Sequence, residues 1–81
     1  MNKVLNSIHM EYHDSSANSH KEYDVELVEE GAGCIVRFKY GRIGGTTIED
    51  VKTPRPVNHI KAYEIFEKLV ESKLKKGYEE V

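Results

Sequence analysis

The spacing of apolar residues changes once along this chain, and that change limits the folds open to it. In several stretches of the first fifty or so residues, apolar and polar side chains alternate. A period of two is typical of antiparallel strands with one buried face. From about residue 57 to 75 the period becomes 3.6, which is typical of an amphipathic helix. The segment TPRP (53–56) separates the two regions, because proline cannot continue a β ladder.

The alternating region predicts four strands, at residues 4–12, 23–27, 34–40 and 46–52. The first strand is expected to place on one face the apolar residues Val4, Ile8, Met10 and Tyr12, with Asn6 as an exception. The fourth strand has the weakest pattern. Gly41 is predicted to break the third strand, so that GRIGG (41–45) forms a tight loop.

The helical region predicts one buried stripe, formed by Ala62, Phe66, Leu69, Val70 and Leu74. Gly77 is predicted to end the helix as its C′ glycine, with Tyr78 folding back onto the last turn. The stripe must pack on the apolar face of the sheet. The predicted fold is therefore α+β: a small antiparallel sheet of about four strands with one long C-terminal helix across one face. The 81 residues suit a single domain, 1–81.

Composition excludes several classes of protein. The hydrophobic content of 38% is too high for a disordered chain, and no apolar run approaches the ~18 residues that cross a membrane. The single cysteine, Cys34, cannot form an internal disulfide, and its place on the apolar side of the third strand predicts a buried structural thiol. A reducing compartment is expected: the cytoplasm, or the nucleus if the host is a eukaryote.

Charge is distributed unevenly along the chain. Residues 1–30 hold two lysines against seven acids, whereas residues 35–63 hold six basic residues against two acids. A basic surface on a chain of net charge −2 suggests a polyanionic partner at one patch. Charges that simply solvate a sheet face would give the same count.

Candidate catalytic groups are few. No nucleophile has a base and an acid in a suitable pattern, so we expect no enzyme activity, no cofactor, no small-molecule substrate and no membrane partner. His9, Glu11 and His13 share one face of the first strand, and His20 could lie across the following loop. Zinc accepts such ligands, but a solvated strand face produces the same alternation, and no metal is predicted.

The segment around Gly41 offers groups that suit an anion. Arg42 would supply a planar fork for phosphate, Tyr40 could stack on a sugar or base, and glycine-rich turns can present backbone N–H groups. GRIGG lacks the pattern of a phosphate-binding P-loop. In the plainer alternative, Tyr40 is the last core aromatic residue, Gly41 is a turn residue with positive φ, and Arg42 is a solvated charge.

Three motifs together resemble the WGR domain, a family named for a Trp-Gly-Arg signature. They are HKEYDVEL (20–27), IVRFKYGRIGG (35–45) and AYEIFEKLVESKLKKGY (62–78), in the family's order and at its spacing. Tyr40 stands where the family has tryptophan, which gives a smaller stacking face and no indole N–H. The resemblance covers nearly the whole chain and implies the same fold as the residue patterns do.

The resemblance also implies a function. WGR domains occur in DNA-dependent poly(ADP-ribose) polymerases, where they bind near DNA ends, and in bacterial proteins. It implies a non-catalytic module that binds nucleic acid, DNA at ends or nicks in particular, through Tyr40, Gly41 and Arg42. Adjacent basic residues that could extend this patch are Lys39, Arg37, Lys52 and Arg55. The alternative is a protein-interaction module that docks or regulates a partner enzyme through the same loop.

Overall fold

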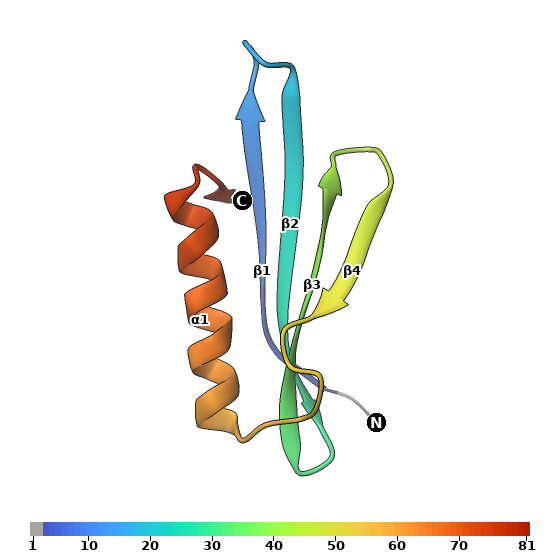
Figure 1. The fold of residues 1–81 in the computed structure, drawn as a ribbon, viewed down its shortest axis with the longest axis vertical. Helices are drawn as coiled ribbons and strands as arrows, with labels where there is room; N and C mark the ends of the chain where they lie inside the picture. The colour runs from blue at the N-terminus through green and yellow to red at the C-terminus, as the bar shows by residue number, and fades with distance from the viewer. Residues whose placement is uncertain (1–2) are drawn as a thin grey trace.

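The computed structural model describes residues 3–81 (Figure 1). Its elements are β1 (Lys3–Asp14), β2 (Ser19–Glu30), β3 (Gly33–Arg42), β4 (Thr47–Val51), α1 (His59–Lys75) and β5 (Glu79–Glu80). The strands form one antiparallel sheet in the order β4-β3-β2-β1-β5. The predicted α+β class is confirmed. We call the face that carries α1 the inner face and the opposite one the outer face.

The hairpin of β1 and β2 is the longest part of the sheet and projects beyond the helix and β3 (Figure 1). Its register shifts by one residue, so that Val4 opposes Val28 while Asn6 opposes Leu27. Cross-strand partners share a face, and residues 27 and 28 lie on opposite faces of a regular strand. The predicted common face for Val4 and Ile8 is therefore wrong, because the bulge reverses the alternation between them.

The third strand does not stop at Gly41, contrary to the prediction. It continues to Arg42, and Gly41 pairs with Glu22 on one side and Thr47 on the other. Glycine is needed there for space: a Cβ atom would lie 2.5 Å from the Thr46 carbonyl oxygen. The positive-φ residue of the turn is Gly44, with φ of 79°. The turn therefore follows Arg42 rather than Tyr40.

The strand β5 was not predicted, and it is too short to show a periodic pattern. It pairs with the middle of β1, where Met10 opposes Glu80, and the Val81 N–H donates to the His9 carbonyl at 3.1 Å. This strand anchors the C-terminal residues against the edge of the sheet.

The helix α1 has a defined cap at each end. It begins at His59, two residues later than predicted, because Val57 pairs with Cys34 and the Asn58 side chain accepts from the Lys61 N–H at 2.8 Å. At the other end the Tyr78 N–H donates to the Lys73 carbonyl, and Gly77 has a φ of 103°, which forms a Schellman cap. The predicted C′ glycine and returning tyrosine are confirmed.

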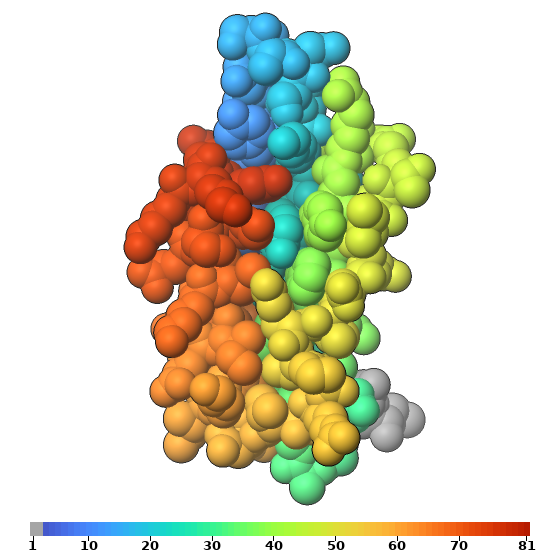
Figure 2. All heavy atoms as spheres, viewed as in Figure 1, coloured from blue at the N-terminus to red at the C-terminus, as the bar shows by residue number. Residues whose placement is uncertain are grey.

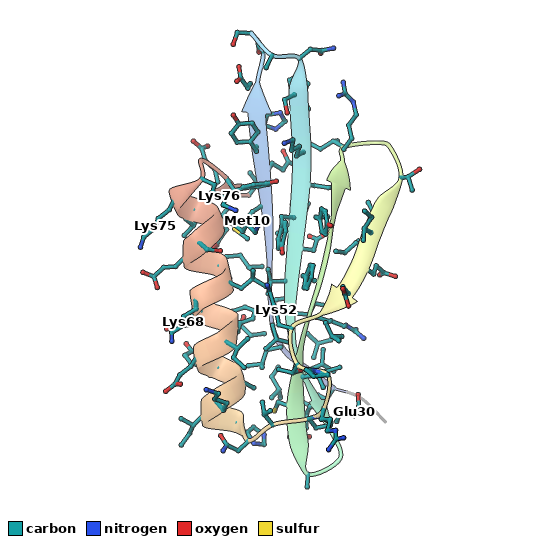
Figure 3. All side chains as sticks on the ribbon, in the orientation of Figure 1. Met10, Glu30, Lys52, Lys68, Lys75 and Lys76 are labelled. Carbon is teal, nitrogen blue, oxygen red and sulfur yellow. The ribbon has the colours of Figure 1, made fainter. Side chains whose placement is uncertain are left out.

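The core lies between the helix stripe and the inner face of the sheet. Its buried members are Met10, Tyr23, Val25, Leu27, Cys34, Val36, Ala62, Phe66 and Leu69. Met10 is seen between the helix and β1 in Figure 3. The Cys34 thiol is fully buried, as predicted, and burial raises its pKa. No helix of the described residues is long and apolar enough to cross a membrane.

Candidate nucleic-acid interface

A groove of about 580 Å³ opens on the inner face, between the C-terminal end of α1 and the strands β2 and β3. In Figure 2 the hairpin of β1 and β2 (blue and cyan) extends past the helix end (red) that borders this region. The groove is lined by Ser19, Lys21, Tyr23, Phe38, Tyr40, Gly41, Arg42, Lys52, Lys73 and Tyr78. Four of these residues are cations, four are aromatic, and none of this described lining is acidic.

The floor of the groove is a set of stacked aromatic rings. The rings of Tyr23, Phe38 and Tyr40 lie 5.5–5.9 Å apart, centroid to centroid, with interplanar angles of 3–19°. They meet because Tyr23 opposes Tyr40 across β2 and β3, with Phe38 two residues along the same face. Tyr78 meets Tyr23 edge-on at 5.9 Å. Burial raises the pKa of Tyr23 to about 12, so its hydroxyl stays protonated at neutral pH.

Two lysines from distant parts of the chain stand over this floor. The Lys73 Nζ lies 4.7 Å from the centroid of the Tyr23 ring, and the Lys52 Nζ lies 5.6 Å from that of Phe38. Burial is the main cause that lowers the pKa of Lys73, and the positive charges of Lys76 and Lys52 lower it further. Cations held close together without a carboxylate among the lining residues form a site that favours an anion.

Arg42 occupies the end of the groove where β3 meets the turn. Its side chain is exposed, and the Nη1 atom donates to the Asn18 carbonyl at 3.3 Å. No ion pair joins it to a carboxylate among residues 3–81. One edge of the guanidinium is thus positioned by the β1–β2 turn, which leaves other N–H groups for a ligand.

Comparison with known proteins identifies the family. The family model of the WGR domain matches residues 6–81, nearly the whole chain. The chain belongs to this family. A search of curated proteins and a search of solved structures each found no match. The WGR domain is a module known from poly(ADP-ribose) polymerases and from bacterial proteins. The match confirms the predicted family.

Each residue of the signature of this WGR domain, Tyr40-Gly41-Arg42, has an identifiable position in the structure. Tyr40 is half-buried and belongs to the ring stack, so it is both a core aromatic residue and part of the groove. Gly41 allows the backbone of β4 to approach closely, and its predicted alternative role as a positive-φ residue is wrong. Arg42 follows on the same face as Tyr40, because side chains two apart share a face.

The structure places the predicted basic residues in three different locations. Lys52 joins Tyr40 and Arg42 on the inner face. Arg37 and Lys39 have the opposite parity on β3 and lie on the outer face. There the Arg37 Nε donates to Glu26 Oε1 at 2.6 Å, and Lys39 is opposed in register by Asp24 and Glu49. Arg55 lies exposed in the link between β4 and α1, outside the groove lining.

Two groove cations were missed by the sequence analysis, although the sequence carries a signal for both. Lys21 lies two residues before Tyr23 and shares its inward parity. Lys73 lies four residues after Leu69, on the buried stripe of the helix. A lysine on an otherwise apolar stripe near the helix end indicates a charge that faces the sheet rather than solvent, with its stem packed on apolar surface.

The outer face carries the histidines that were weighed as metal ligands. His9 forms hydrogen bonds with Asp24 and Glu11. The bond with Asp24 is the main cause that raises the pKa of His9, and the bond with Glu11 raises it further. His13 Nε2 lies 2.9 Å from Glu11, and its Nδ1 lies 2.9 Å from Nδ1 of His20. The predicted proximity of His20 across the loop is confirmed.

Proposed function

We propose that this WGR domain is a non-catalytic module that binds DNA, at ends or nicks, through the groove on its inner face. The observation that carries the proposal is the composition of that groove. Four cations surround a floor of aromatic rings, and among residues 3–81 none that lines the groove is acidic. Cations that follow a backbone, together with stacking faces for bases or sugars, are the shared features of non-specific nucleic-acid sites.

Each groove residue has a role in this proposal. Arg42 binds a phosphate through its free N–H groups, and Lys21, Lys52 and Lys73 neutralise neighbouring phosphates. Tyr40, which lines the groove, packs on the sugar or base at a strand terminus. Arg55 lies exposed outside the groove lining, and we propose no phosphate contact for it. Arg37 and Lys39 lie on the other face, and we propose no contact for them in this complex.

The test is a titration of labelled duplexes that are blunt-ended, nicked or circular, at two salt concentrations. The variants are Arg42→Ala and, as a control of equal charge change on the outer face, Lys39→Ala. We expect Arg42→Ala to weaken binding at least tenfold and Lys39→Ala to leave it within a factor of about two. No binding of wild type below about 100 μM would refute DNA binding, since that is weaker than ordinary non-specific affinity.

The same titration separates DNA from a protein partner. A module that docks an enzyme through this loop would bind the three duplexes equally weakly, with a shallow salt dependence. Equal losses for Arg42→Ala and Lys39→Ala would keep DNA binding but contradict the groove as its site.

A further inference from the structure

The outer face holds a second cluster of polar residues that DNA binding does not use. On β1 and β2, His9 opposes Asp24, and the next pair on the same face is Glu11 opposite Glu22. Ligand atoms of His9, Glu22 and Asp24 all lie within 4.8 Å of one another. Two carboxylates placed directly opposite each other, as Glu11 and Glu22 are, repel unless a positive charge lies between them.

We propose that His9, Asp24 and Glu22 bind a divalent first-row transition-metal ion, with Zn²⁺ as the probe that tests it. One imidazole nitrogen and two carboxylates are ligands that such ions accept, and three protein ligands leave a coordination position open. The site does not depend on the proposed DNA contact, because it lies on the opposite face of the sheet.

The orientation of His9 supports a ligand role. Its Nε2 lies 3.2 Å from Glu11 Oε2, while its Nδ1 is directed at Asp24. Without an ion, the Nδ1–H donates to Asp24; a metal ion would replace that proton and part the two ligand atoms, releasing the proton to solvent. Glu11, which accepts the Nε2–H, would meanwhile keep the imidazole oriented. Glu11 is itself held by His13 through its other oxygen at 2.9 Å. This chain of contacts positions the imidazole before any ion arrives.

The surroundings leave room for an ion. On the β3 side, the residue opposite Glu22 is Gly41, which has no side chain to cover the site. His9 and Asp24 also line a concave region of about 600 Å³ on the outer face. Lys39 opposes Asp24 in register, but no ion pair joins them among residues 3–81. The side chains of His9 and Asp24 are 37% and 28% exposed, so an ion can enter from solvent.

The rival arrangement uses the other two histidines. His13 and His20 place their Nδ1 atoms 2.9 Å apart at the far end of the same face, and a metal could draw on that pair instead. A proton shared within the network, with no metal at all, is the other alternative. A calcium ion, which takes oxygen ligands, would use the carboxylates without His9.

The primary measurement needs only wild type, so it does not depend on a variant folding. Histidine side chains labelled with ¹⁵N are followed by NMR while ZnCl₂ is added. The proposal predicts a large shift of His9 Nδ1, saturating at one equivalent, with Nε2 still protonated. No change of His9 at about 1 mM Zn²⁺, a shift confined to His13 and His20, or binding of Ca²⁺ but not Zn²⁺ would each overturn it.

Calorimetry on variants assigns the ligands. His9→Ala is expected to weaken Zn²⁺ binding at least tenfold, and Glu11→Ala by about ten- to hundredfold as the residue that orients His9. His59→Ala is the matched control, because His59 lies at the start of α1 near Glu29, and it should leave the affinity unchanged. Circular dichroism confirms that each variant is folded. A loss for His20→Ala with none for His9→Ala would contradict the assignment.

Discussion

Replacing Lys73 by methionine tests the groove as a site for phosphates. Methionine keeps the long apolar stem over Tyr23 and removes only the charge. Four cations line the groove; if each neutralises one phosphate, log K falls with log salt at a slope of about −3.6. Lys73→Met should reduce this slope to about −2.7, and it should weaken binding about tenfold at low salt, as the loss of one charged hydrogen bond implies.

The assay is fluorescence anisotropy of a labelled nicked duplex between about 50 and 200 mM salt. Over this range wild type should lose about 150-fold in affinity and Lys73→Met about 40-fold. The control is Lys75→Met, because Lys75 points away from the sheet (Figure 3). Its charge change is identical, so long-range attraction is matched. An unchanged slope for Lys73→Met, or an equal change for Lys75→Met, would refute the assignment of phosphates to this groove.

Three further predictions concern the fold that holds the groove. Gly41→Ala should lower the free energy of unfolding by about 1–3 kcal/mol, because the new Cβ would meet the Thr46 carbonyl; Gly45→Ala, whose Cβ would have ordinary contacts, should change it little, as urea denaturation can show. Asn58→Ala should lower the free energy of unfolding by about 1 kcal/mol through loss of the N-cap, whereas Asn58→Ser should retain most of that stability because serine can also cap the helix. Tyr23 should ionise near pH 12 in an ultraviolet absorbance titration. Its pKa is raised on folding, so stability should fall above pH 10 by up to about 1.4 kcal/mol per pH unit, and a Tyr23→Phe variant should lack that component.

The sequence predicted the fold well because two signals were strong over long segments. The alternation on the strands and the helical stripe each required a single buried face, and Gly77 fixed the helix end. Leu74, predicted to end the buried stripe, is instead 44% exposed, because it lies in the last turn of the helix. The errors fall where one residue changes the geometry. Neither the bulge after Val4 nor the close approach of Thr46 to Gly41 leaves a pattern in the sequence, because both depend on what the neighbouring strand does.

The candidate site was predicted only in part, for a related reason. Proximity along the chain grouped Arg37 and Lys39 with Tyr40. Because side chains alternate along a strand, Arg37 and Lys39 lie on the outer face and Tyr40 lies on the inner face. The useful partner, Lys73, is more than thirty residues away and reaches Tyr23 only once the helix has packed. Parity along each strand would have separated the two sets of cations. The helical stripe indicates that Lys73 faces the sheet, but which strand residue it meets depends on how the helix packs.

The two faces of the sheet differ in charge. Cations line the groove beside α1, whereas on the other side the acids, among them Glu11, Glu22 and Asp24, outnumber Arg37 and Lys39. Because the sheet is a single layer, one face of the molecule attracts a polyanion and the opposite face repels it. A domain seated on one duplex would turn a negative surface outward and repel a second. If the proposed DNA binding holds, each copy is therefore expected to cover a single duplex rather than to bridge two.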